Sequence, residues 1–141
     1  MDSNSANALL QKVRTRATEE ASDLHAVLHA AYDAVVQGNF DAFGESLTDD
    51  VELSICGFGP IDGTWHGRQA VVAAARANYA QISQQQPQIE AMIRQGDSLA
   101  VLLLESGVFK ATGEAYSVRA VQWFTFENRK IKKIDEVVAS I

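Results

Sequence analysis

The chain has 141 residues, of which 47% are hydrophobic and 21% charged, a balance typical of one folded domain of ordinary size. Twelve Lys and Arg against 18 Asp and Glu give a formal charge of −6, which disfavours binding to nucleic acid or to an anionic membrane. The single cysteine, Cys56, excludes an internal disulfide, and the sequence has neither an apolar signal core nor a run of about 18 apolar residues, so we expect a cytoplasmic protein.

The first part of the chain predicts a tail and then a helix. Residues 1–18 are mixed and polar, which indicates a flexible tail or a loosely packed helix before a single domain over residues 19–141. From Thr18 to Gln37 apolar residues recur at spacings of three and four, as on one face of an amphipathic helix. Gly38 can adopt the left-handed conformation that ends such a helix.

A short helix and a strand are expected next. Asn39 is placed to cap a second helix that carries Phe40, Phe43 and Leu47 on one side. In the segment Val51 to Cys56 apolar and polar residues alternate, which predicts a strand with one buried face.

A loop and a third helix complete this part of the chain. Residues 57–67 contain four glycines and Pro60, which is typical of a loop. The alanine-rich segment 68–83 predicts a helix, and Pro87 forbids its continuation.

Segments of strand composition follow Pro87, with short turns between them. They cover about residues 88–95, 98–109, 115–127 and 130–139. Because Gly96-Asp97, Thr112-Gly113 and Glu127-Asn128-Arg129 suit hairpin turns, we expect consecutive strands to be antiparallel. Helices followed by such a meander indicate the α+β class.

Apolar residues occur on both faces of the predicted sheet. Leu99 to Leu104 is apolar at every position, and Val121 and Trp123 face opposite to Phe124. Because no further helix is available to cover the second face, we expect a homodimer that packs through Val121, Trp123 and Arg119. A scattered apolar surface is the alternative.

Three motifs occur in an order that is known from one superfamily. They are Tyr32–Val51 (YDAVVQGNFDAFGESLTDDV), Gly63–Val71 (GTWHGRQAV) and Val118–Ile134 (VRAVQWFTFENRKIKKI). On these motifs the chain resembles the nuclear-transport-factor-2-like superfamily, in particular its SnoaL-like and ketosteroid-isomerase-like members. The resemblance implies a cone in which a curved antiparallel sheet wraps around three N-terminal helices and encloses a pocket for a hydrophobic small molecule.

The known chemistry of the relatives does not carry over to the matching positions. Ketosteroid isomerase uses an Asp base together with a Tyr and a protonated Asp that stabilise an oxyanion. The resemblance places Ile55 at the base, Gln122 at the oxyanion Asp, and Ala31, next to Tyr32, at the Tyr. Since Ile55 cannot move a proton, we do not expect this constellation to isomerise steroids. An epoxide hydrolase would need an Asp two residues from Arg119, where the chain has valine.

Other polar residues fall on the strand face that should look toward the helices. Alternation along the aligned strands places Glu105, Gln122 and Glu136 there, and these are the candidate catalytic residues. Burial among aliphatic side chains raises the pKa of a carboxyl group and suits it to acid–base chemistry near neutral pH. A solvated position at the rim, or a bulge that reverses the alternation, is the alternative.

The expected ligand contacts lie on that inward face or on the helices and the loop that cover it. Trp65, on the loop, is expected to act as a lid. They are Tyr32, Phe40, Phe43, Leu53, Ile55, Trp65, Leu103, Phe124, Ile134 and Val138.

Three functions remain open at this point. The first is an enzyme without a cofactor that isomerises, cyclises or dehydrates a hydrophobic carbonyl compound. The second is a non-catalytic binder of a hydrophobic ligand, and the third is a dimeric interaction module with a cone filled by aromatic side chains. We expect no metal, because His25 and His29, one helical turn apart, have no evident third ligand.

Overall fold

The computed structural model describes residues 23–141, so the tail predicted for residues 1–18 lies outside the described range. The elements in chain order are a helix over residues 23–36, α2 (Phe40–Glu45), β1 (Leu47–Cys56), the short 3-10 helix η1 (Gly59–Ile61), β2 (Gly63–His66), α3 (Arg68–Gln81), β3 (Ile82–Gln95), β4 (Ser98–Phe109), β5 (Ala115–Glu127) and β6 (Lys130–Ser140). None of the helices in this range is long and apolar enough to cross a membrane.

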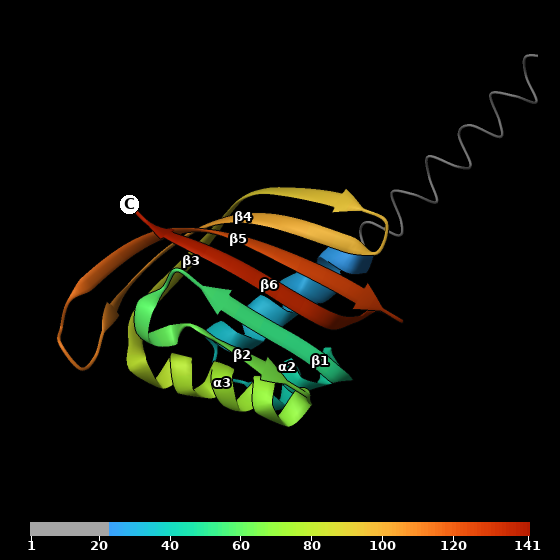
Figure 1. Cartoon of the computed structure of the whole chain (residues 1–141), viewed down its shortest axis with the longest axis horizontal. Helices are drawn as coiled ribbons and strands as arrows, with labels where there is room; N and C mark the ends of the chain where they lie inside the picture. Colours follow the sequence, from blue (N-terminus) through green and yellow to red (C-terminus); the bar gives the residue numbers. More distant parts are fainter. Residues whose placement is uncertain (1–22) are drawn as a thin grey trace, which may run out of the picture.

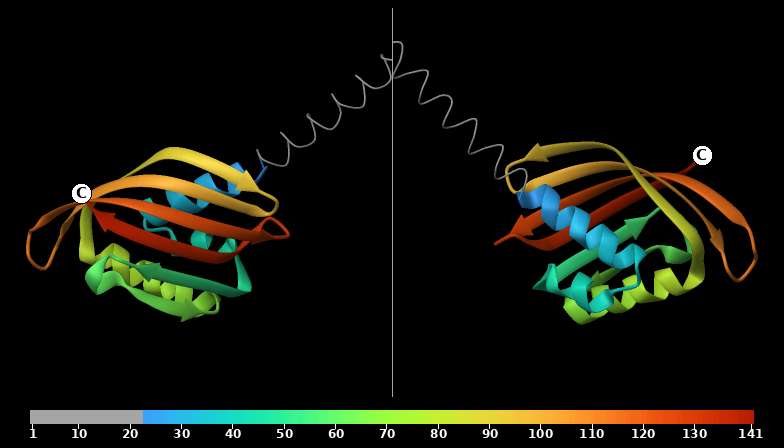
Figure 2. Two further views of the ribbon diagram at one scale, coloured as in Figure 1. Left: turned by 45° about the horizontal axis from the view of Figure 1, so that its top comes forward. Right: turned by 180° about the vertical axis from the view of Figure 1, so that it is seen from behind.

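All strands belong to one curved sheet in the order β2-β1-β6-β5-β4-β3. The helix over residues 23–36, drawn in blue, crosses one face of the sheet, and α2 and α3 lie beside β1 and β2 (Figure 1). The opposite, outer face carries no helix of the described chain (Figure 2). The predicted α+β class and the cone built of a sheet wrapped around helices are confirmed.

The pairing of β1 with β6 is parallel, whereas all other neighbouring strands are antiparallel. The sheet is therefore mixed and not wholly antiparallel as predicted. The hairpin turns that the sequence reveals connect only neighbours in the chain. They carry no information on the pairing of β1 with β6, because the four strands β2 to β5 lie between them in the chain.

The signals at the helix ends work as predicted. Gly38 has a φ of 72° at the end of the first helix, and its N–H donates to the carbonyl of Val35 at 3.0 Å. The Asn39 side chain caps α2 by accepting a hydrogen bond from the Ala42 N–H at 3.2 Å. Leu47, expected on α2, instead begins β1 and is fully buried.

The two edge strands, β2 and β3, differ from the sequence prediction. β2 forms within the predicted loop and pairs with β1, with Trp65 opposite Leu53. β3 begins at Ile82 and includes Pro87, because an edge strand has one side without ladder bonds and tolerates a residue that lacks an N–H. The third helix accordingly ends at Gln81 and not at residue 83.

The core lies between the helices and the inner face of the sheet. Every second residue of β4 and β5 points into it, as the alternation predicts. The buried members from these strands include Leu99, Val101, Leu103, Val118, Ala120, Gln122, Phe124 and Phe126.

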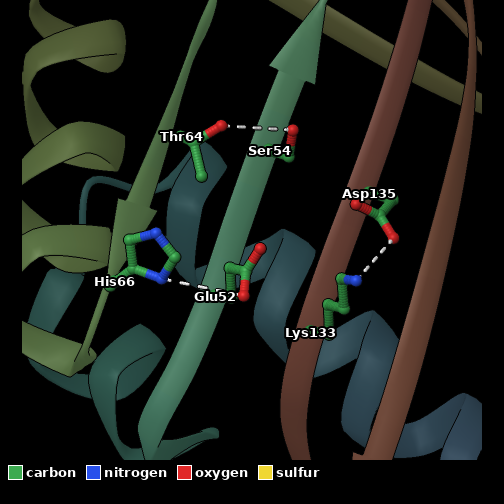
Figure 3. A network of polar contacts seen from close by, with 6 residues as sticks. All are labelled: Glu52, Ser54, Thr64, His66, Lys133 and Asp135. Atoms are coloured by element: carbon green, nitrogen blue, oxygen red, sulfur yellow. Dashed lines mark hydrogen bonds and ion pairs between the residues drawn. The ribbon is translucent and has the colours of Figure 1, made fainter.

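The outer face is divided into a polar and an apolar half. Over β2, β1 and the facing part of β6, polar pairs occupy the surface (Figure 3). His66–Glu52 at 3.7 Å and Ser54–Thr64 at 3.5 Å join β2 to β1, and Lys133–Asp135 at 3.6 Å lies within β6. Over β3 to β6 the exposed side chains include Ile93, Val121, Trp123 and Val137, which we call the outer apolar patch.

Candidate functional site

A cavity of about 160 Å³ lies between the first helix and the inner face of the sheet. Most of the residues that the sequence nominated for a site line it. These are Tyr32, Phe43, Leu53, Ile55, Leu103, Glu105, Gln122, Phe124, Ile134 and Glu136. The cavity is smaller than the roughly 300–1,000 Å³ of pockets for drug-sized ligands, so a ligand enclosed in it would be compact.

Three of the nominated ligand contacts lie elsewhere. Phe40 packs edge-on against Tyr79 and lines a separate groove with Arg76, whose guanidinium carbon is 5.4 Å from the ring centre. Val138 is buried in the core but does not line the cavity. Trp65 lies on β2 with its ring over Gly63, because this segment is an extended edge strand and not a loop free to close as a lid.

A chain of hydrogen bonds joins the first helix to β5 and β6. Gln122 and Glu136 are opposite each other in the β5–β6 register, and the Gln122 Nε2 donates to the Glu136 Oε2 at 2.9 Å. The Tyr32 hydroxyl donates to the Gln122 Oε1. Tyr32 is itself held edge-on against Phe124, with ring centres 6.0 Å apart. The amide of Gln122 is therefore bonded at both ends.

The surroundings of Glu136 favour its protonated form. Burial raises the pKa of this carboxyl group from 4.5 to about 7, the hydrogen bond from Gln122 opposes the rise, and the negative charge of Glu105 adds to it. Burial, together with the charges of Glu136 and Glu105, also raises the pKa of Tyr32. Near neutral pH, Glu136 can thus gain or lose a proton, while Tyr32 stays a neutral donor.

Glu105 is held by two neutral donors. The Tyr116 hydroxyl donates to its Oε2 and the Gln85 Nε2 to its Oε1, each at 2.9 Å. Burial and the Glu105 carboxylate raise the pKa of Tyr116, so this phenol also stays protonated. Glu105 lines the same cavity as Glu136.

Tyr116 and Gln85 are not among the site residues predicted from the sequence. Tyr116 shares the alternation of Gln122 along β5, so the signal for it was present. Gln85 precedes Pro87, where no strand was expected. It lies at a register shift of β3 between Ser83 and Gln86, and such bulges redirect side chains.

Aromatic rings gather around the Glu105 end of the site. Phe58 packs on Tyr116 with ring centres 5.2 Å apart, and Phe109 on Tyr116 at 4.9 Å. Of these, Phe58 lines the cavity. The Asp62 carboxylate fixes the Phe58 loop by accepting hydrogen bonds from the N–H groups of Gly57 and Phe58 at 3.1 and 2.6 Å.

Comparisons with known proteins agree with the fold described above. A family model described as a SnoaL-like domain matches residues 28–134. The search of curated proteins gives no match.

Solved structures share the fold at low sequence identity. An NTF2-like protein from Burkholderia xenovorans superposes with a TM-score of 0.72 at 19% identity, covering 83% of this chain and 89% of its own. An LEH-like epoxide hydrolase from M. tuberculosis gives 0.69 at 13% identity, covering 83% of each chain. A protein with a ketosteroid isomerase-like fold from Catenulispora acidiphila, in complex with trimethylamine, gives 0.68 at 18% identity, covering 78% of this chain and 82% of its own.

Proposed function

The chain belongs to the SnoaL-like domain family, and on this premise we propose that it is a cofactor-independent enzyme that moves a proton on a small hydrophobic carbonyl compound. One observation carries the proposal. Glu136, with a pKa of about 7, lines a cavity among aliphatic side chains and is oriented by Gln122. A carboxyl group that titrates near the working pH can both accept and return a proton.

Glu136 is the proton-transfer group in this proposal. Gln122 occupies one of its two oxygens, and no described residue bonds the other, Oε1. As a carboxylate, Glu136 takes the proton from the carbon next to the substrate carbonyl, and the electron pair moves to the carbonyl oxygen to form an enolate. The protonated Glu136 then returns the proton to another carbon, so that the sum is an isomerisation or the first step of a cyclisation or dehydration.

Tyr32 and Gln122 hold Glu136 in place during this transfer. While Glu136 is ionised, Tyr32 donates to Gln122 and Gln122 donates to Glu136. The proton that Glu136 accepts is held on Oε1, so Oε2 continues to accept from Gln122 and both bonds persist through the transfer. The two bonds therefore keep the carboxyl group oriented while it takes and returns the proton.

The test uses a β,γ-unsaturated cyclohexenone, a single-ring ketone whose isomerisation to the conjugated enone is followed by ultraviolet absorbance. We expect turnover by the wild type that rises with pH through about 7, as Glu136 becomes ionised. Glu136→Gln should lose roughly 10²–10⁴-fold in rate, the usual contribution of a positioned acid–base group. Glu114→Gln, which removes an exposed carboxylate, is the matched control. Equal rates in the wild type and Glu136→Gln would refute the catalytic role.

A non-catalytic binder is the second candidate function. The same cavity would hold a ligand without turning it over, and a structural neighbour was crystallised with a small molecule, trimethylamine. Saturable binding of small ligands, with no turnover of any carbonyl compound, would favour this candidate. The third possibility, a filled cone, has less support, because the cavity persists between Phe43 and Phe124.

We also propose that the protein is a homodimer that packs through the outer apolar patch. Val121, Trp123 and Val137 are 46%, 37% and 60% exposed, on strands that pair side by side. Polar cross-strand pairs border the patch along β1 and β2 (Figure 3). Arg119 lies on the same face, and its guanidinium pairs with Glu90 of the same chain at 3.6 Å. Apolar patches with polar borders are typical of protein interfaces.

A further inference from the structure

Among the described residues, those that line the cavity include two carboxyl groups and no basic side chain. Glu105 on β4 and Glu136 on β6 are the carboxyl groups, and none of the other lining residues of this range is Lys, Arg or His. Over residues 23–141, the ion pairs involve other carboxylates and leave both of these glutamates without a cation. Carboxylates that leave water are normally paired with a positive charge. A bound ligand can supply the positive charge that residues 23–141 do not place beside these glutamates.

Glu105 retains the capacity to accept further hydrogen bonds. Tyr116 and Gln85 each bond one of its oxygens, whereas an ionised carboxylate offers about four acceptor positions. Both donors are neutral, so they orient the carboxylate without cancelling its charge. An ammonium group, with several N–H donors, matches the positions that remain.

The spacing of the two glutamates leaves room for an apolar body between them. Glu105 is opposite Val118 on β5, and Glu136 is opposite Gln122 on the same strand. Val118 and Gln122 are four positions apart, which corresponds to about 13 Å along a strand. Phe58 and Phe124 line the cavity between the first helix and the sheet, and ring faces attract cations as well as apolar groups.

We infer that the cavity selects a small amine, bound as its ammonium ion with the nitrogen at Glu105 and its apolar body among the aromatic and aliphatic side chains. The inference rests on the proposed function, because it specifies the substrate class of the same cavity. For the enzyme, the substrate would be a compact carbonyl compound that also carries a basic nitrogen. Carboxylates and phosphate esters would be excluded by the charge of the site.

The ammonium group would also act on Glu136. The groups that face this carboxyl are Gln122 on β5, Tyr32 on the first helix and, through its charge, Glu105 on β4. The charge of Glu105 favours the protonated form of Glu136, and a cation beside Glu105 cancels that effect. Ligand binding should therefore release a proton near pH 7 and leave Glu136 ready to act as a base.

The test compares three single-ring probes of nearly equal size by titration calorimetry: benzylammonium, benzyl alcohol and benzoate. In the wild type we expect benzylammonium to bind about tenfold more tightly than benzyl alcohol, as an additional charged contact allows, and benzoate not to bind. Repeating the titration near pH 7 in buffers of different ionisation enthalpy measures the proton released. Glu105→Gln should lower the affinity for benzylammonium to that for benzyl alcohol, and the exposed control Glu114→Gln should change neither.

The outcomes separate this inference from the proposed function. Binding of benzyl alcohol as tight as that of benzylammonium, or unchanged affinity for benzylammonium in Glu105→Gln, overturns the amine site and leaves the role of Glu136 intact. Binding of none of the three probes also overturns it. Retained isomerisation in Glu136→Gln, with the expected preference for benzylammonium, would instead refute the catalytic proposal alone. Binding of benzyl alcohol by Glu105→Gln shows that this variant is folded.

Discussion

At the scale of single residues, the proton affinity of Glu136 has causes on three strands and one helix. Register places it opposite Gln122, Tyr32 of the first helix orients that amide, and the charge of Glu105 on β4 adds to the effect of burial. Glu105, on the same sheet face, has two hydrogen-bond donors of its own. Two carboxyl groups of one cavity thus have different surroundings, which is the arrangement that separates acid from base roles.

The raised pKa of Glu136 predicts how its presence changes stability with pH. Its pKa is 4.5 in an unfolded chain and about 7 in the folded protein, so between these values the folded state binds more protons. The contribution of Glu136 is therefore fully present below pH 4.5 and is lost as the pH rises through 7. At roughly 1.4 kcal/mol per pKa unit, the full loss is about 3–4 kcal/mol.

Urea unfolding at pH 5 and pH 8 measures this loss. We expect Glu136→Gln, which cannot ionise, to gain up to about 3 kcal/mol in free energy of unfolding relative to the wild type between the two pH values. Glu114→Gln, at an exposed position, serves as control. If the wild type and Glu136→Gln change equally with pH, Glu136 does not carry the proton.

At the scale of elements, the end of β1 depends on a close approach to β6. Gly57 has a φ of 90°, and a Cβ added to it would lie 2.1 Å from the carbonyl oxygen of Val138. Gly59, with a φ of 67°, has open space around the same position. The two glycines share a positive φ that would strain an alanine, and only at Gly57 would a backbone atom also obstruct the added Cβ.

This contrast gives a matched pair of variants. Alanine at Gly59 should cost about 1–2 kcal/mol through the left-handed backbone alone. Gly57→Ala should cost at least about 2 kcal/mol more, because the parallel β1–β6 contact must open. Urea unfolding of both proteins checks the difference, and equal costs would show that β1 and β6 are not held this closely.

At the scale of the whole molecule, the cavity and the outer apolar patch lie on opposite faces of one sheet. Side chains alternate between the faces, so Gln122 points to the cavity while its neighbours Val121 and Trp123 point outward. Assembly through the patch would leave the cavity lining unchanged.

We therefore expect Trp123→Lys to separate the proposed dimer without loss of the cavity. A stable interface buries about 800 Å² of each partner. The charge that Trp123→Lys introduces would be buried in that interface, which opposes assembly. Light scattering coupled to size-exclusion chromatography should give a dimer for the wild type and a monomer for Trp123→Lys, with isomerisation or probe binding retained. Ser54→Lys, in the polar half of the same face, should stay dimeric. A monomeric wild type would contradict the proposed assembly.

Local rules in the sequence account for much of the fold and of the candidate site. The end of the first helix at Gly38, the cap at Asn39 and the three hairpin turns follow from conformational preferences of single residues. The two-residue period of a strand placed Glu105, Gln122 and Glu136 on the inner face, since the ladders of β4, β5 and β6 keep the alternation in that region. The same period places Tyr116 on the inner face, although it was not predicted as a site residue.

Only the tertiary structure decided the features that depend on pairing between strands. The parallel pairing of β1 with β6 joins segments far apart in the chain, whereas the edge strand β2 and the bulge that brings Gln85 to Glu105 depend on pairing with β1 and β4. The bond from Tyr32 to Gln122 spans 90 residues, and the pKa of Glu136 depends on the packing that removes water around it. The sequence by itself determined which residues face inward, because alternation is a property of the local backbone. The structure decided which of them meet and at what proton affinity, because hydrogen bonds and desolvation are properties of the assembled core.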